Sequence, residues 1–265
     1  MEGSGSAAFS SILSELRALE DGVALGGVLT EALIGELATR AQSAADGASW
    51  QPPLLSQLYV RRSGPLREWS ERRNVCIAGE GASEPQIGTG FSVTPSAEGM
   101  LILGRGAKLH KVAMMETGGL IVVGDEAKLA AVTLSVKGRS VIMIGEETAA
   151  TFLAQLDSRN GGAILVGGDG LWANDLRIIT DDMHAIRDLE SGARINRFGG
   201  RVRIGRHVWF GERCAVIGDC HIGADTVIGM GSLVTNGDLP PNSVCVGWPA
   251  RPIRSGVTWS REDVP

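Results

Sequence analysis

The chain has 265 residues, a formal net charge of −5 at pH 7 and 43% hydrophobic residues. This length suffices for one large domain with its own core, with or without an appendage. The negative charge argues against a general affinity for nucleic acid or for anionic membranes. Glycine is abundant, with 37 residues, and aromatic residues make up only 5%, as a repetitive chain of strands and tight corners requires.

No targeting or membrane signal is visible in the sequence. There is no run of about eighteen apolar residues, and no basic start followed by an apolar stretch and a cleavage site. We therefore expect a cytoplasmic protein without membrane insertion. The four cysteines are few for a disulfide framework and form no C-x-x-C pair, so we interpret them as packing residues: Cys76, Cys214, Cys220 and Cys245.

Residues 1–96 differ in pattern from the rest of the chain. The segments FSSILSELRALED and VLTEALIGELATRAQSAA place apolar residues three and four positions apart, which is typical of amphipathic helices. Glycine and proline then interrupt the pattern, and GEGASEPQIGTG has the composition of a linker. We predict two or three helices that cap an exposed sheet edge or form an oligomer contact, with substrate recruitment as the alternative.

Four apolar segments with a common ending follow the linker. LILG, IVVG, IMIG and ILVG end in glycines that are 20, 21 and 22 residues apart: Gly104, Gly124, Gly145 and Gly167. Three six-residue repeats would span eighteen residues, so each interval is slightly longer than three repeats. We interpret the segments as turns of a solenoid that carry small loops at their corners.

The next glycine of this kind comes 38 residues later, a gap of one eighteen-residue turn plus twenty residues. Counting in sixes from Val166 passes Trp172 and Ile178, which we expect to be buried. The next step falls on His184. A loop over about residues 181–201 is therefore expected to leave the turn at this histidine, and long loops on regular scaffolds are frequent functional sites.

A strict six-residue repeat follows the loop. Six apolar residues occupy it at unbroken intervals of six: Ile204, Phe210, Val216, Ile222, Ile228 and Val234. The positions two residues before each of them hold small or β-branched residues. A period of six fits neither an amphipathic helix nor an alternating strand. It is typical of a parallel β-helix, in which three short strands complete one triangular coil.

These patterns together predict a mainly β protein. Its parts are an N-terminal helical segment with a linker (1–96), a parallel β-helix with hexapeptide repeats and the loop (97–256), and a C-terminal tail (257–265).

The run RVRIGRHVWFGERCAVIGDCHIGADTVIGMGSLVTNGDLPPNSVCVGWPARPIR resembles the C-terminal coils of the hexapeptide-repeat acyltransferases, whose fold is a left-handed parallel β-helix. Together with the preceding RIITDDMHAIRDLESGARIN, it is similar to the branch that O-acetylates sugars in polysaccharide and lipopolysaccharide assembly. The resemblance covers about residues 100–256. It implies a left-handed coil, a homotrimer, and an acetyl-CoA-dependent transferase that acts on a hydroxyl of a sugar or glycan precursor.

Acetyl transfer to a hydroxyl requires a base, because the hydroxyl loses its proton as its oxygen attacks the thioester carbonyl. A neutral histidine suits that task near pH 7. His184 matches the histidine of the family's D-x-H motif and is the predicted general base, with a surface loop histidine as the alternative. Asp182 is the first candidate for orienting its ring, and Asp188 is the second. Direct transfer needs neither a cysteine nucleophile nor a metal.

The resemblance also implies where acetyl-CoA binds. In these enzymes its long arm lies between two subunits, beside the C-terminal coils. Four residues match positions near that groove: Trp209, Gly211, Gly229 and Ser232. Arg251 and Arg254 match the basic residues of the family's tail that can meet the nucleotide phosphates. Packing between subunits is the alternative role of Trp209, and solvation is that of the two arginines.

Three other functions compete with sugar O-acetylation. A γ-type carbonic anhydrase shares the solenoid but needs two histidines five residues apart, a spacing absent among His110, His184, His207 and His221. A noncatalytic scaffold would show no thioester turnover and no effect of His184→Ala. Acetylation of an amino acid, antibiotic or metabolite is the third alternative. The acceptor contacts lie in loops, and the sequence pattern does not indicate which acceptor these loops bind.

Overall fold

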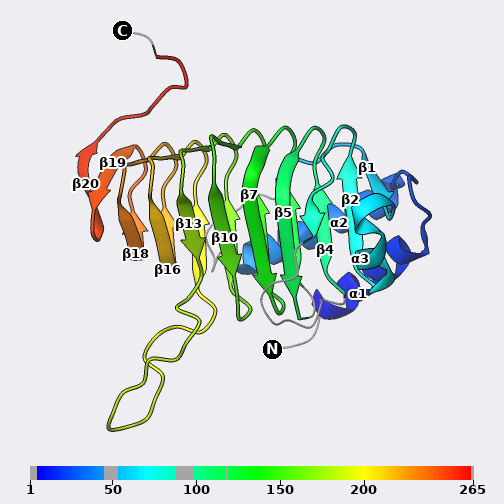
Figure 1. The fold of residues 1–265 in the computed structure, drawn as a ribbon, viewed down its shortest axis with the longest axis horizontal. Coiled ribbons are helices and arrows are strands. Elements are labelled where there is room, and N and C mark those ends of the chain that lie inside the picture. The colour runs from blue at the N-terminus through cyan, green and yellow to red at the C-terminus, as the bar shows by residue number, and fades with distance from the viewer. Residues whose placement is uncertain (1–4, 45–52, 88–97, 117–118, 264–265) are drawn as a thin grey trace.

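The computed structural model describes residues 5–44, 53–87, 98–116 and 119–263. Within these ranges the chain winds as a parallel β-helix with three faces, and helices lie along one side of it (Figure 1). A mainly β chain with an N-terminal helical segment is the architecture that the sequence predicts. Each turn of the β-helix is called a coil below.

The first face stacks parallel strands from nearly every coil. Its members are β2 (Val75–Gly79), β4 (Met100–Leu103), β6 (Leu120–Val123), β8 (Val141–Ile144), β11 (Ala163–Val166), β14 (Arg201–Ile204) and the second half of β16 (Ala215–Ile222). One column of aligned residues runs through these strands: Leu101, Ile121, Ile142, Ile164, Val202 and Cys220. The loose upstream repeats and the strict repeats therefore belong to one continuous solenoid.

The other two faces are built from shorter strands. The second face contains β9 (Ala149–Ala150), β12 (Leu171–Trp172), β15 (Trp209–Phe210), β17 (Val227–Ile228) and β19 (Ser243–Gly247). The third contains β3 (Gln86–Ile87), β5 (Lys108–Met115), β7 (Lys128–Lys137), β10 (Ala154–Ser158), β13 (Leu176–Ile179), the first half of β16, and β18 (Leu233–Leu239). The pairing of β5 with β7 has a register shift near its start. The first residues of both strands therefore form the corner that precedes the third face.

Antiparallel strands close the two ends of the stack. At the first coil, β1 (Leu58–Arg61) pairs with β2, and the short helices η1 (Gly64–Leu66) and α3 (Arg67–Glu71) follow it. At the last coil, β20 (Ala250–Ser255) turns back along β19. These additions satisfy backbone groups that an open edge would leave unpaired.

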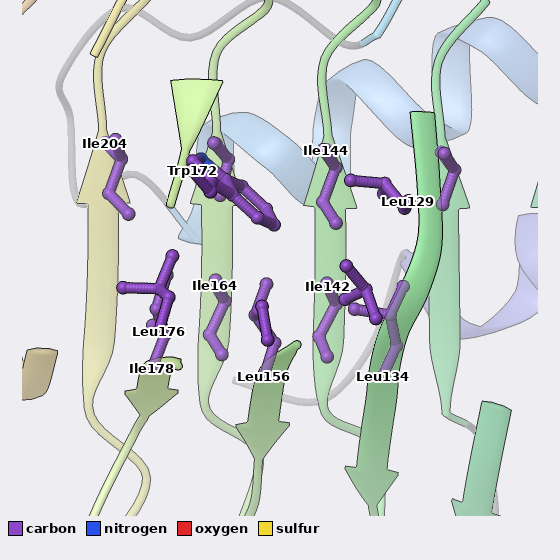
Figure 2. Packing of buried hydrophobic residues seen from close by; sticks show 14 of the residues in the cluster. Leu129, Leu134, Ile142, Ile144, Leu156, Ile164, Trp172, Leu176, Ile178 and Ile204 are labelled. Carbon is purple, nitrogen blue, oxygen red and sulfur yellow. The ribbon is translucent and has the colours of Figure 1, made fainter. Parts of the chain in front are cut away.

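The interior holds the aliphatic residues that the period of six predicts. All six residues of the strict repeat are buried, as are Trp172 and Ile178 of the preceding coil. Figure 2 shows such side chains pointing inward from neighbouring coils, with Trp172 beside Ile204 and Ile144. Stacking of like residues in successive coils thus gives one continuous core.

Glycine follows the buried residue because two coils touch at that corner. A Cβ atom built on Gly205 would lie 2.5 Å from the backbone nitrogen of Ala224 in the next coil. At Gly145 it would lie 2.2 Å from the nitrogen of Gly168. Only glycine permits this approach of backbones.

Two helices cover the outside of the first face. Helices α1 (Gly5–Ala18) and α2 (Gly27–Ala44) bury Leu16, Leu33 and Leu37. These leucines share a cluster with the outward residues of β2, β4, β6, β8 and β11. Strands such as MLIL, LIVV and VIMI are apolar on both faces for this reason, since one face meets the core and the other meets the helices.

The boundaries differ from expectation in two respects. Parallel stacking begins at β2, before residue 97, where the sequence placed the start of the solenoid. The helices lie along the side of the β-helix, whereas we expected them to cap an end; the alternative, a contact with another subunit, stays a prediction. Among the described residues, no helix is both long and apolar enough to cross a membrane.

Candidate functional site

The predicted loop is a hairpin that projects from the β-helix. It leaves after β13, which ends at Ile179, and returns at Arg201, where β14 begins. An antiparallel bridge between Arg187 and Arg194 joins its two arms. Figure 1 shows it extending well away from the coils. The expected excursion over about residues 181–201 is therefore present, and it carries its own hydrogen bonds.

Asp181 anchors both ends of this hairpin to the coil. Its side chain is buried, with an exposed fraction of 5%. The carboxylate accepts hydrogen bonds from the backbone N–H of Met183 at 2.8 Å, the backbone N–H of Gly199 at 3.2 Å, and Nδ2 of Asn160 at 2.8 Å. Because a buried carboxylate with three donors is well satisfied, Asp181 fixes the point at which the hairpin departs.

Asn196 holds the segment that carries His184. Its Nδ2 donates to Oδ2 of Asp182 at 2.9 Å and to the backbone oxygen of His184 at 2.8 Å. Its Oδ1 accepts from the backbone N–H of Ile186 at 2.9 Å. The imidazole of His184 is exposed on this braced segment. Sequence reasoning missed Asn196, because a single sequence gives no signal for which residues face each other across a hairpin.

Neither candidate acid contacts the His184 ring in the described chain. The Asp182 carboxylate is held by Asn196. Asp188 caps the tip of the hairpin, where it accepts from the N–H of Ser191 at 2.8 Å and from its hydroxyl at 2.7 Å. These bonds, the backbone one foremost, hold the pKa of Asp188 below its usual value. The choice of an orienting acid stays a prediction.

Three of the predicted donor-binding residues lie along one edge of the solenoid. Trp209 pairs with Val227 of the next coil, and its side chain is 38% exposed. The backbone N–H of Gly211 donates to the oxygen of Ile228 at 2.8 Å, immediately before Gly229. Trp209, Gly211 and Gly229 therefore occupy the second face and the corner that follows it.

The remaining three candidates fall into two groups. Ser232 is only 1% exposed, and its hydroxyl accepts from the backbone N–H of Gly247 at 3.1 Å, so its side chain braces the last coil. Arg251 and Arg254 are exposed on β20, beyond the last coil.

The hairpin and the Trp209 edge lie at different corners of the triangle. The hairpin leaves between the third and first faces, after β13. Gly211 and Gly229 lie between the second and third faces. One chain therefore presents the candidate base and the candidate donor edge on opposite sides of its third face.

The cysteines are unsuited to nucleophilic chemistry. All four are free thiols with buried side chains, in agreement with their interpretation as packing residues. Burial raises the pKa of Cys76 to about 12 and that of Cys220 to about 11, so the reactive thiolate is disfavoured at neutral pH. Over the described ranges, no three histidine, cysteine or acidic side chains gather as metal ligands.

Residues 201–236 match the family described as bacterial transferase hexapeptide (six repeats). The Staphylococcus aureus (strain COL) protein SACOL2570, named as an acetyltransferase, is 46% identical over 55 residues, which are 21% of this chain and 27% of that protein. The Mycobacterium tuberculosis protein Rv3034c, also named as an acetyltransferase, is 26% identical over 161 residues, 59% of this chain and 50% of its own. The chain thus spans a quarter to a half of these relatives.

Two solved structures share the fold. The polysialic acid-specific acetyltransferase NeuO is 22% identical with a TM-score of 0.63, and the match covers 72% of this chain and 86% of NeuO. The polysialic acid O-acetyltransferase OatWY is 22% identical with a TM-score of 0.56, covering 71% of this chain and 92% of OatWY. The chain therefore contains the repeats of the bacterial transferase hexapeptide family and folds as a left-handed parallel β-helix, like these two acetyltransferases.

Proposed function

We propose that this protein transfers an acetyl group from acetyl-CoA to a hydroxyl of a sugar or glycan precursor, with His184 as the general base. The observation that carries the proposal is the hairpin, which interrupts a hexapeptide coil and presents an exposed imidazole on a braced backbone. A packing role would bury this ring. A base that serves a bound substrate must instead remain accessible to it.

The chemistry needs two proton transfers and no covalent intermediate. His184 takes the proton from the attacking hydroxyl, the hydroxyl oxygen forms an ester with the acetyl carbon, and the thiolate of coenzyme A leaves and receives the proton from the His184 imidazolium. Asp182 is our candidate for orienting the ring, since it stands two residues from His184 and Asn196 fixes it to the same segment.

The donor is proposed to lie along the edge formed by Trp209, Gly211 and Gly229. The half-buried backbone at this edge is our candidate for meeting the amides of the pantetheine arm, while Arg251 and Arg254 are the candidate cations for the nucleotide phosphates. Because His184 and this edge are separate in one chain, we propose a homotrimer in which the hairpin of one subunit meets the donor edge of its neighbour.

A sugar acceptor is the preferred choice on the evidence of the structural neighbours. NeuO and OatWY are named for acetylation of polysialic acid. The matching fold supports a carbohydrate hydroxyl here, and the proposed reaction takes place in the cytoplasm, where acetyl-CoA is supplied.

The test is release of free thiol from acetyl-CoA in the presence of a panel of sugars and small hydroxyl acceptors. We expect turnover by the wild-type protein and a loss of about 10²–10⁴-fold in kcat for His184→Ala, because a positioned base contributes that much. Binding of coenzyme A should persist in the variant. His110→Ala is the matched control, since His110 is an exposed histidine on β5 outside the proposed site. Full turnover by His184→Ala would refute the mechanism.

A further inference from the structure

The segment that follows β20 lies against the corners of several coils and is called the strap, residues 257–263. The backbone N–H of Val257 donates to the oxygen of Asn242 at 3.1 Å. The hydroxyl of Thr258 donates to Asp225 at 3.0 Å, and Arg261 Nη2 reaches the backbone oxygen of Gly170 at 3.2 Å. The strap therefore runs back across four successive coils, since the coil of His207 lies between those of Asp225 and Gly170.

Trp259 is the buried residue of this otherwise mostly exposed segment, with an exposed fraction of 9%. Its indole stacks on the imidazole of His207 with 4.0 Å between ring centroids and 8° between planes. Its Nε1 donates to the backbone oxygen of His207 at 2.8 Å, and its own backbone oxygen lies 3.0 Å from Nε2 of His207. Three separate contacts thus fix Trp259 on one residue of the coil.

Asp169 and Arg261 complete this cluster. Oδ2 of Asp169 lies 2.7 Å from Nδ1 of His207, and Oδ1 accepts from Nη2 of Arg261 at 3.0 Å. The guanidinium of Arg261 also lies 5.7 Å from the centre of the Trp259 ring. Partial burial by itself raises the pKa of Asp169, but the bonds from His207 and Arg261 outweigh it and hold the pKa below its usual value. The cluster joins two coils to the strap.

The same indole also contacts Trp209, two residues after His207. The centroids of the Trp259 and Trp209 rings are 6.0 Å apart and the planes are tilted by 49°, within the favourable range for aromatic pairs. Trp209 is partly exposed on a two-residue strand, so its backbone is fixed but its side chain needs a neighbour to select one orientation.

We propose that Trp259 is a positioning residue that holds the Trp209 side chain in the orientation which lines the donor edge. The inference rests on the proposed function, since it assigns Trp209 to the acetyl-CoA groove. The strap then acts on donor binding and leaves the hydroxyl deprotonation by His184 untouched. Loss of Trp259 should therefore raise the KM for acetyl-CoA with little change in kcat.

The experiment measures coenzyme A binding by calorimetry and steady-state kinetics for Trp259→Ala, Trp209→Leu and the double variant. An aromatic contact of this type corresponds to about a threefold to tenfold change in affinity, which we expect for Trp259→Ala. In the Trp209→Leu background, which lacks the ring contact, the same change should have a clearly smaller effect, because the two residues act through one contact. Trp259→Phe, which retains an aromatic ring, should recover most of the affinity.

Two further variants guard against unfolding and local damage. Arg261→Gln loosens the strap without altering either tryptophan and should weaken coenzyme A binding in the same direction. Glu262→Gln changes an exposed strap residue whose side chain makes none of these contacts and should match the wild type.

The outcomes separate this inference from the proposed function. A wild-type protein that fails to bind coenzyme A removes the proposed function, and the role of Trp259 falls with it. Normal wild-type binding together with equal effects of Trp259→Ala in both backgrounds would overturn the positioning role alone. The same holds if Trp259→Ala lowers only the melting temperature.

Discussion

Individual polar side chains fix the hairpin, which is the part of the β-helix that does not follow the six-residue repeat. Asp181 accepts bonds from both ends of the hairpin, and Asn196 clasps the segment around His184. The hydrogen bonds of these two side chains take the place of the strand pairing that a regular coil would supply. Since a polar group with several partners has few alternative positions, these two residues fix the backbone that carries the imidazole.

Replacement of Asp181 provides a test at this scale. Asp181→Ala leaves the N–H groups of Met183 and Gly199 without their acceptor, and the unsatisfied donor of Gly199, whose bond is buried, costs about 1–3 kcal/mol. We expect a lower free energy of unfolding and faster hydrogen exchange of the hairpin amides. Asp181→Asn keeps one carbonyl oxygen and should lose less. Unchanged exchange in the alanine variant would contradict the anchoring role.

The helices and the first face of the β-helix depend on each other. Outward residues on β4, β6 and β8 are apolar and lie under α1 and α2. At β14 the outward residues become Arg201 and Arg203, and this strand alternates between half-buried and buried positions. The change from continuous to alternating apolar residues along the chain thus marks how far the helical cover extends.

Truncation of a buried leucine in α2 tests that dependence. Leu37 is fully buried between the helices and the first face, so Leu37→Ala should lower the free energy of unfolding by about 2–5 kcal/mol. Val28→Ala, on the same helix at a largely exposed position, should change it by less than about 0.5 kcal/mol. Denaturant titration of both variants makes the measurement. A small loss for Leu37→Ala would mean that the helices contribute little to stability.

Assembly is the issue at the scale of the whole molecule, because one chain keeps its two candidate half-sites apart. His184 lies on a hairpin after the third face, while Trp209 lies on the second. The exposed side chains on the hairpin include Met183, Ile186 and Phe198, more apolar surface than a solvated loop needs. In the proposed homotrimer, a neighbouring subunit would cover these residues as it completes the site.

Complementation between two inactive variants tests the shared site. In a homotrimer, co-expressed His184→Ala and Trp209→Ala chains form some interfaces that combine an intact hairpin with an intact donor edge. Those mixed oligomers should regain thiol release that neither variant shows alone, with a mass near three times 27.8 kDa. Activity of the mixture no greater than the sum of the separate variants would show that each chain uses its own residues.

The fold was largely predictable from the sequence, and the site only in part. The positions of Ile204, Phe210 and the other inner residues followed from a period of six, since each repeat meets the same environment in the coil above. The hairpin was located by a break in that count. Its internal bonds were not, because Asn196 and Asp182 are fourteen residues apart and no periodic rule relates them. Trp259 lies in the predicted C-terminal tail, 52 residues from His207, and no pattern in the sequence indicated a contact between the two residues.

The sequence by itself determined the three-sided coil, its buried column and the point at which His184 leaves it, because these features repeat locally and depend on near neighbours. Only the tertiary structure decided where the helices lie, which side chains brace the hairpin, and that the strap returns to His207 and Trp209. Those contacts join distant segments, and their geometry is fixed by packing of the whole chain, which no local pattern encodes.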